Sequence, residues 1–175
     1  MDLKKFIRSI PDYPKKGILF RDITTLIKDN KAFKYSIDQM VNKIQNLDFE
    51  KIVAIESRGF LFASAVAYKM NKPLILIRKK NKLPADTYSE DFELEYGKAT
   101  IEIHKDSVKK NETVIIIDDL IATGGTAAAA GKLIEKSGGK IKCFVFVINL
   151  FDLGGIKLLE KNSYKSVALI DFPGH

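Results

Sequence analysis

The chain has 175 residues, 46% of them hydrophobic, which is enough for one domain with a sizeable core. Its 29 Lys and Arg residues outnumber its 22 acids and give a net charge of +7, but they are scattered without a basic stripe interleaved with aromatic residues, which favours a solvated surface over nucleic-acid binding. One cysteine (Cys143) and two histidines (His104, His175) exclude a disulfide framework and a thiolate or imidazole metal cage, and no apolar run approaches the roughly 18 residues of a membrane span, so a cytoplasmic location is expected.

Helical and strand-like segments alternate along the chain. The first half predicts a short helix over 3–10, a loop over 11–17, a helix over 33–47, a strand over 52–55, a helix over 60–70 and a strand over 74–77. The second half predicts a long mobile loop or ribbon over 79–96, strands near 99–103 and over 114–117, a helix from 127, a strand over 141–149, a short helix near 154–162 and a last strand over 166–170. This alternation indicates an α/β domain with a parallel sheet and helices on both faces, whose ligands bind beyond the strand carboxyl ends.

The most informative segment follows the strand predicted over 114–117. Two acids, Asp118 and Asp119, come first, then the turn Ala122-Thr123-Gly124-Gly125-Thr126, and then an alanine-rich helix from Ala127. Glycines let backbone N–H groups approach a phosphate, threonine hydroxyls add donors, and a helix N-terminus favours negative charge, while paired carboxylates accept hydrogen bonds from vicinal hydroxyls. An ordinary strand–turn–helix connection is the alternative, but capping needs one acid and not two. The segment therefore predicts a ligand that carries both a phosphate and a sugar.

Arginine is informative because it is scarce in this lysine-rich chain. The four arginines are Arg8, Arg21, Arg58 and Arg78, and the last three lie beside motif-like segments. A guanidinium where lysine otherwise serves the surface suggests planar, multidentate recognition. The alternative for Arg58 is a surface ion pair.

Several segments besides the phosphate turn resemble one family, the adenine phosphoribosyltransferases. The segments are Ile10–Pro14, Gly17–Ile23, Glu56–Phe60, Arg78–Lys80, Lys82–Pro84, Leu94–Lys98, Asn149–Gly155 and Phe172–His175. The signature at 118–126 alone indicates only the superfamily that binds phosphoribosyl pyrophosphate (PRPP). The Phe-Arg-Asp and Leu-Glu-Tyr-Gly segments resemble the adenine enzyme more specifically, and the resemblance runs from end to end.

The resemblance implies the type I phosphoribosyltransferase fold, a single domain over 1–175 with a central parallel twisted sheet flanked by helices. It also implies a small base-binding hood over 1–24 and a mobile catalytic loop over 79–96. The implied reaction joins adenine to the phosphoribosyl group of PRPP and gives AMP and pyrophosphate. Mg²⁺ would be held mainly through PRPP oxygens and water, without a protein metal cage. A homodimer is expected because family members are dimers, and neither nucleic acid nor membrane is an expected partner.

The resemblance also assigns the PRPP contacts. The 5′-phosphate would lie on the glycine turn, the ribose hydroxyls on the two acids, and the pyrophosphate on the turn at 56–58, where the family carries a non-proline cis peptide. Two lysines would reach in from the mobile loop. The residues concerned are Glu56, Ser57, Arg58, Lys79, Lys82, Asp118, Asp119, Ala122, Thr123, Gly124, Gly125 and Thr126.

By the same resemblance, Phe20 stacks on adenine opposite Leu120, and main-chain groups of Leu19 and Arg21 read the purine edge. From the sequence alone Phe20 is equally compatible with a core position. Glu95, with Arg58, is the catalytic candidate, because Glu95 would take the imidazole proton of adenine. Its alternative is one acid among several on a solvated ribbon.

Two other functions remain open at the level of sequence. The same fold could use another base, such as xanthine or orotate, although the segments around 21 and 95 argue against this. A non-enzymatic PRPP sensor would need an added DNA-binding module, for which no residues are left over. The departures from the family pattern, Ser57 and Ala127, remove no side chain with an assigned role.

Overall fold

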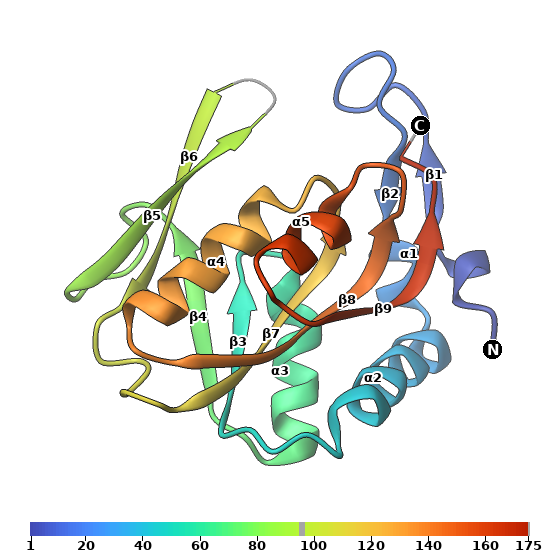
Figure 1. The fold of residues 1–175 in the computed structure, drawn as a ribbon. Coiled ribbons are helices and arrows are strands. Elements are labelled where there is room, and N and C mark those ends of the chain that lie inside the picture. Colours follow the sequence, from blue (N-terminus) through green and yellow to red (C-terminus); the bar gives the residue numbers. More distant parts are fainter. Residues whose placement is uncertain (95–96, 175) are drawn as a thin grey trace.

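The computed structural model describes residues 1–94 and 97–174 of the chain. The helices are a 3₁₀-helix (Leu3–Phe6), α1 (Thr24–Lys28), α2 (Asn30–Ile44), α3 (Gly59–Met70), α4 (Gly125–Lys136) and α5 (Gly155–Lys161). The strands are β1 (Arg8–Ile10), β2 (Phe20–Asp22), β3 (Lys51–Ile55), β4 (Leu74–Lys79), β5 (Thr87–Leu94), β6 (Gly97–His104), β7 (Thr113–Ile121), β8 (Lys140–Leu150) and β9 (Ser166–Phe172). Most of the elements expected from the sequence are thus present (Figure 1).

A seven-stranded sheet in the order β5-β6-β4-β3-β7-β8-β9 forms the centre of the molecule. Strands β4, β3, β7, β8 and β9 are neighbours in this order and pair in parallel. Strand β6 runs antiparallel to β4 and to β5. The chain moves outward in one direction from β3 to β4 and in the other from β7 to β9. The strand order therefore reverses between β3 and β7, which is where open α/β sheets bind their ligands.

Strand β7 extends further than its neighbour β3, and this opens the crevice. The last pair between them joins Ala54 and Ile117, but β7 continues to pair with β8 as far as Ile121 and Asn149. The sequence predicted that the strand would stop before Asp118, and this boundary was wrong. Because β8 supplies the backbone partners that β3 no longer offers, the two acids lie within the strand, past the end of β3.

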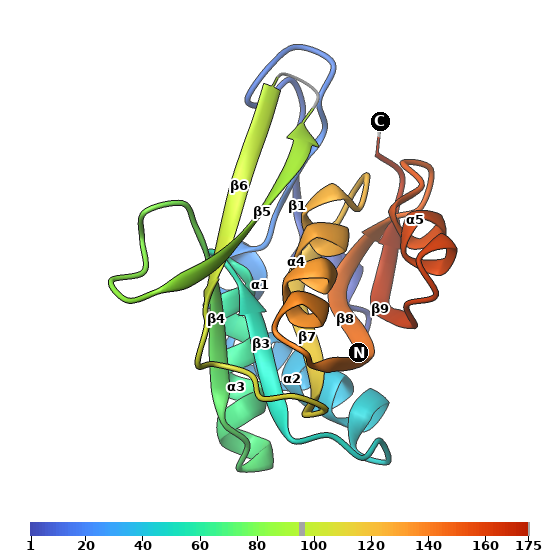
Figure 2. The same cartoon turned by 60° about the vertical axis from the view of Figure 1, so that its left-hand side comes forward.

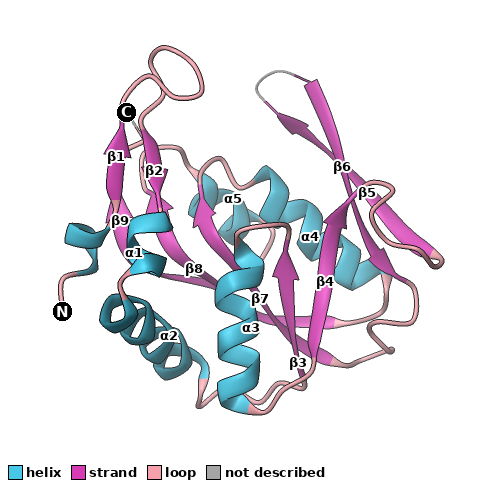
Figure 3. Cartoon of the chain, turned by 180° about the vertical axis from the view of Figure 1, so that it is seen from behind, coloured by secondary structure: helices cyan, strands magenta, loops and turns pink. Residues whose placement is uncertain are grey.

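Helices cover both faces of the sheet, as expected. Figures 1 and 3 view the molecule from opposite sides, with α4 and α5 in front in Figure 1 and α2 and α3 in front in Figure 3. Alternate residues of β7 enter the two cores: Ile115 and Ile117 pack with α2 and α3, and Val114 and Ile116 with α4. The run of β-branched residues is therefore buried on both sides. Among the helices in the described residues, none is both long and apolar enough to span a membrane.

The ribbon that the sequence offered as one alternative for 79–96 is β5, paired along its length with β6. It extends beside α4 (Figure 2) and is attached to that helix by side chains. Lys136 Nζ donates to the carbonyl of Ser89 at 3.0 Å, and Lys132 lies 3.5 Å from Glu90. Among the described residues of this segment, the irregular part is therefore limited to the connection over 80–86.

The helix predicted over 3–10 was wrong in its second half. Only Leu3–Phe6 is helical, and Arg8–Ile10 forms β1, antiparallel to β2. A helix this short is marginal by itself, and pairing with β2 satisfies the backbone of residues 8–10 better. Arg8 and Asp22 form an ion pair across this small sheet.

Candidate active site

A cavity of about 370 Å³ lies at the carboxyl ends of β3 and β7, at the point where the strand order reverses. It is lined by Glu56, Ser57, Arg58, Lys79, Asp118, Asp119, Leu120, Ile121, Ala122, Thr123, Gly124, Gly125, Thr126 and Ala127. The fold therefore brings together nearly all the residues that the sequence assigned to PRPP, although they come from three separate stretches of the chain.

The turn between β7 and α4 has the geometry of an anion site. Gly124 has φ +86°, a conformation that favours glycine, and it leads directly into α4 at Gly125. In the part of the chain that the structure describes, no side chain caps this helix. The first helical N–H groups and the helix dipole therefore face the cavity, with hydroxyls from Thr123 and Thr126 beside them.

The phosphate turn is supported from behind by the start of α5. A methyl group at Gly155 would collide with the carbonyl of Ala122 and lie 2.6 Å from Cγ1 of Ile121. A methyl group at Gly124 would in turn lie 2.9 Å from Cα of Gly155. Sequence reasoning missed this role of Gly155; its only signal was the Gly154-Gly155 pair in a segment noted for its family resemblance.

The turn after β3 carries the cis peptide bond expected at Glu56–Ser57. The Glu56 carboxylate accepts hydrogen bonds from the N–H of Lys79 at 2.8 Å and from Arg78 Nε at 3.2 Å. Burial acts to raise the pKa of Glu56, but these hydrogen bonds and the positive charge of Arg78 outweigh it and lower the pKa. Glu56 is thus an ionised link that holds the end of β4, and with it Lys79, against the cavity.

Helix α3 begins unusually close to β7. A methyl group at Gly59 would lie 2.8 Å from Oδ1 of Asp118 and 3.0 Å from the carbonyl of Ile117. Only glycine allows this approach without a shift of backbone. It brings Arg58, the residue before the helix, beside the two acids of β7.

Asp118 and Asp119 form a coupled pair of carboxyl groups. The N–H of Asp119 donates to Oδ1 of Asp118 at 2.8 Å. Burial and the neighbouring carboxylate raise the pKa of Asp118 well above its ordinary value. Burial also raises the pKa of Asp119, although the positive charge of Arg58 opposes it. Two acids held this close bind protons or hydrogen-bond donors readily.

Arg58 joins the acid pair to the predicted base platform. Its Nε lies 2.9 Å from Oδ2 of Asp119, and its guanidinium carbon lies 5.4 Å from the centre of the Phe20 ring. That Asp119 oxygen is buried beside Arg58, and no donor in the described residues makes an aligned hydrogen bond to it. Tyr13 packs against Phe20 edge to face, with 5.1 Å between ring centres.

The remaining predicted residues lie outside the cavity lining or outside the described residues. Leu19, Phe20 and Arg21 lie in the segment over 1–24 that was predicted to be the hood, and the side chain of Arg21 is directed to the carboxyl-terminal tail. Lys82 is exposed, and its carbonyl accepts from Arg78 Nη1 at 3.3 Å. Glu95 falls outside the described residues.

Known proteins resemble this chain over its full length. A phosphoribosyl transferase domain matches residues 24–172. The adenine phosphoribosyltransferase of Pelagibacter ubique (strain HTCC1062) is 67% identical over 175 residues, which is 100% of both chains. The adenine phosphoribosyltransferase structure from Thermoanaerobacter pseudethanolicus has a TM-score of 0.94 and 46% identity, covering 98% of each chain. That from Saccharomyces cerevisiae, complexed with D-2,5-dideoxy-2,5-imino-altritol 1,6-bisphosphate and adenine, has a TM-score of 0.90 and 34% identity, covering 97% of each chain.

These similarities agree with the geometry of the cavity, in which a glycine turn at a helix N-terminus faces two acids and an arginine. The sheet order, the cis peptide bond and the family segments are all present in one molecule. The chain belongs to the adenine phosphoribosyltransferase family.

Proposed function

We propose that this chain transfers the 5-phosphoribosyl group of PRPP to adenine and releases AMP and pyrophosphate, as a purine salvage enzyme. The observation that carries this proposal is the cavity itself, where an uncapped helix N-terminus and a coupled acid pair meet at the switch point of the sheet. A phosphate and a ribose joined in one substrate match these two halves of the cavity. The solved relative from Saccharomyces cerevisiae was complexed with a bisphosphate and adenine, which supports this pairing of ligands.

In this proposal PRPP spans the cavity from the phosphate turn to the turn after β3. Its 5′-phosphate accepts hydrogen bonds from the backbone and hydroxyl groups of Ala122-Thr123-Gly124-Gly125-Thr126. Asp118 and Asp119 accept hydrogen bonds from the ribose hydroxyls. The backbone of the turn Glu56-Ser57-Arg58 and the guanidinium of Arg58 contact the pyrophosphate. Lys79 and Lys82 approach the pyrophosphate from the side of β4 and β5.

Adenine lies against the hood over residues 1–24. Phe20 stacks on one face of the ring and Leu120 packs on the other, while main-chain groups of Leu19 and Arg21 read its edge. A carbonyl there accepts the exocyclic amine of adenine and repels the oxo group of hypoxanthine, a mismatch that can discriminate by roughly 10⁴. The contact between Arg58 and Phe20 supports the placement of the base beside the ribose site.

The chemical step exchanges one bond at C1′ of the ribose for another. The bond to pyrophosphate breaks, with its electron pair leaving on oxygen, and a ring nitrogen of adenine forms the new bond from the opposite side. Glu95 takes the proton that the imidazole ring loses. Arg58 and Lys79 offset the charge that develops on pyrophosphate, and most of the rate enhancement comes from positioning and charge stabilisation in a site that excludes water.

Mg²⁺ would be held in this site mainly by PRPP oxygens and water. Among the described residues, no group of three or more His, Cys, Asp or Glu side chains is arranged to hold a metal ion. Two adjacent carboxylates that line the cavity, Asp118 and Asp119, would suit contact with the water shell of a cation that substrate oxygens hold. The ion would supply charge neutralisation of the pyrophosphate.

The protein acts as a homodimer in this proposal, and the outer face of α3 supports it. Leu61 and Tyr68 lie on that face with 47% and 91% exposure, and Leu76 of the neighbouring β4 is 36% exposed. A helix that is apolar on both sides is typical of one covered by a further layer. The cytoplasm is the proposed location, because PRPP is a polyanion that does not cross an apolar bilayer.

A base-panel assay tests the proposed function. With adenine, PRPP and Mg²⁺, the purified chain should form AMP and pyrophosphate in equal amounts. It should form little product from hypoxanthine, xanthine or orotate. Turnover of one of those bases in place of adenine would assign a different transferase. Sequence-specific DNA binding without turnover of any base would favour the PRPP sensor.

A further inference from the structure

The side chain of Arg21 is buried on the side of the hood that faces away from the proposed base site. It is 6% exposed, which is rare for an arginine without a carboxylate bonded to it. Its Nη1 donates to Oγ of Ser9, its Nη2 donates to the carbonyl of Pro173 at 2.8 Å, and its guanidinium carbon lies 4.4 Å from the centre of the Phe172 ring. The contact with Pro173 joins residues 152 positions apart in the sequence.

The carboxyl-terminal tail over Phe172–Gly174 is itself fixed on the body of the protein. The carbonyl of Phe172 accepts from the N–H of Phe151 at 3.1 Å. The N–H of Gly174 donates to Asp152 Oδ1 at 2.7 Å. A methyl group at Gly174 would lie 2.6 Å from Cγ of Leu153, so the tail fits closely here only as glycine. Figure 1 shows the carboxyl-terminal end of β9 beside β1 and β2.

Strand geometry makes the two sides of the hood dependent on each other. Phe20 and Arg21 are consecutive residues of β2, so their side chains point to opposite faces. Phe20 contacts Arg58 at the cavity, while Arg21 contacts the tail. A rotation or shift of β2 that loosens Arg21 therefore also moves Phe20 and the main chain between them.

The contacts of Arg21 suit arginine and not lysine. Burial lowers the pKa of Arg21, and the carboxylate of Asp152 partly restores it. Its Nε has no hydrogen-bond partner among the described residues, so the burial is incompletely compensated. An apolar residue of similar volume is often at least as stabilising as a buried charge, so stability alone gives little reason for an arginine here. A planar guanidinium can stack on Phe172 and bond two oxygens at fixed angles, which an ammonium does not reproduce.

We propose that the carboxyl-terminal tail, held by the side chain of Arg21, sets the position of the hood and so the fit of adenine between Phe20 and the cavity. Arg21 is then a positioning residue for the base through its side chain, in addition to its main-chain contact. The tail residues Phe172 and Pro173 contribute to this positioning through their contacts with Arg21. This inference rests on the proposed binding of adenine at the hood.

The test changes the contact from both of its ends. Arg21→Lys removes the planar fork, and Asp152→Ala removes the group that holds Gly174 and faces the charge of Arg21. Each variant should raise the KM for adenine about tenfold, as expected for the loss of a hydrogen bond to a charged group, and leave the KM for PRPP within about twofold. Asp38→Ala is the control, because the Asp38 carboxylate on α2 also accepts hydrogen bonds, from Lys34 and Lys69, but lies in neither the hood nor the cavity lining. It should leave both constants near the wild-type values.

Amide hydrogen exchange supplies a readout that does not depend on turnover. Residues 18–22 should exchange faster in both variants than in the wild type, while β3 and β7 keep their protection. Unchanged exchange in the hood, or a rise in both KM values together, would overturn the inference. If Arg21→Lys does not fold, Asp152→Ala decides from the side of the tail. A wild-type protein that makes no AMP would remove the proposed function, whereas the exchange data would still decide whether tail and hood are coupled.

Discussion

Asp118, a residue of the proposed binding site, lowers the stability of the free protein when its carboxyl group is ionised. Its pKa is raised by burial and by Asp119, so the native state binds a proton more tightly than the unfolded chain does. The stability that this group contributes is fully present below its ordinary pKa of 3.8 and is lost as the pH rises through the native pKa. At neutral pH, where the ribose hydroxyls would bind it, the ionised carboxylate of Asp118 therefore lowers the stability of the free protein.

Asp118→Asn should consequently raise the melting temperature of the free protein at pH 8, and by much less at pH 4. An amide keeps the neutral form at every pH, so the variant escapes the repulsion from Asp119. The gain should be a few degrees, since about 1 kcal/mol corresponds to roughly 2–4 °C in a domain of this size. Calorimetric scans at the two pH values measure it.

The same scans on Asp38→Asn give the control with the opposite sign. Hydrogen bonds from Lys69 and Lys34 lower the pKa of Asp38, so its contribution to stability is present at pH 8 and is lost as the pH falls.

Asp118→Asn combined with Asp119→Asn should also lower turnover by about 10²–10³. A double variant with wild-type turnover would remove both acids from the proposed site.

At the level of elements, the start of α5 determines where the phosphate turn lies. Gly155→Ala should raise the KM for PRPP about tenfold, because its methyl group would push Ala122 toward the cavity, and overpacking of this kind costs about 1–3 kcal/mol. The KM for adenine should change little. Steady-state kinetics with each substrate varied in turn separates the two effects.

Gly139→Ala is the matched control for this prediction. A methyl group at Gly139 would lie 2.6 Å from Val108 Cγ1 and 2.9 Å from Ile134 Cγ2, a clash of similar severity in residues that do not line the cavity. It should lower the melting temperature and leave the KM for PRPP unchanged. Equal effects of the two variants on KM would mean that Gly155 acts only through general stability.

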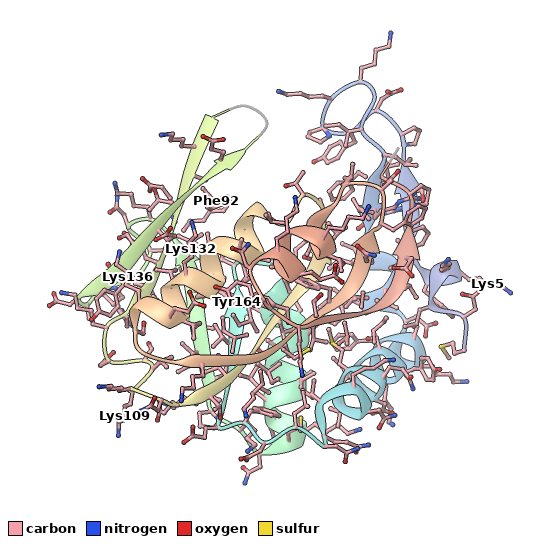
Figure 4. The ribbon with its side chains drawn as sticks, viewed as in Figure 1. Lys5, Phe92, Lys109, Lys132, Lys136 and Tyr164 are labelled. Atoms are coloured by element: carbon pink, nitrogen blue, oxygen red, sulfur yellow. The ribbon has the colours of Figure 1, made fainter. Side chains whose placement is uncertain are left out.

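The pairing of β5 leaves a shorter segment that could close over the cavity than the sequence predicted. The sequence predicted a mobile loop or ribbon over 79–96. In the structure the backbone of β5 pairs with β6, and Lys132 and Lys136 of α4 contact β5, whose Phe92 lies beside the same helix (Figure 4). A methyl group at Gly125 would lie 3.7 Å from Cδ2 of Phe92, so the ribbon also approaches the phosphate turn where α4 begins.

Hydrogen exchange with and without PRPP and Mg²⁺ should therefore separate two parts of this segment. The alternate amides of 87–94 that bond to β6 should be protected in both states, because the β6 ladder already satisfies them. The connection over 80–86, which carries Lys82, should gain protection when PRPP binds. Equal exchange at 80–86 in both states would show that this connection does not close on PRPP.

At the scale of the whole molecule, the exposed face of α3 leads to a prediction about assembly. Light scattering should find a dimer for the wild type and a monomer for Tyr68→Glu, because a buried, unpaired charge strongly disfavours an apolar interface. Leu47→Glu, at an exposed apolar residue after α2, should remain dimeric. A monomeric wild type would contradict the proposed homodimer.

The sequence by itself determined the α/β class, the family and the chemistry of the phosphate turn. Each depends on neighbouring residues: the run Val114–Ile117 specifies a buried strand, and the small residues of Ala122–Thr126 specify a turn that admits an anion. The fold class and family membership are confirmed, whereas the roles of individual site residues, Glu95 among them, stay predictions.

The tertiary structure alone decided where the strand of the acids ends, what Arg58 and Arg21 contact, and which glycines the site requires. Asp118 and Asp119 stay in β7 because β8 continues to pair with it, and Arg58 reaches Asp119 because Gly59 lets α3 approach the strand. These contacts join residues far apart in the chain. Their geometry depends on which surfaces are buried against each other, and local periodicity and turn chemistry contain no information about that.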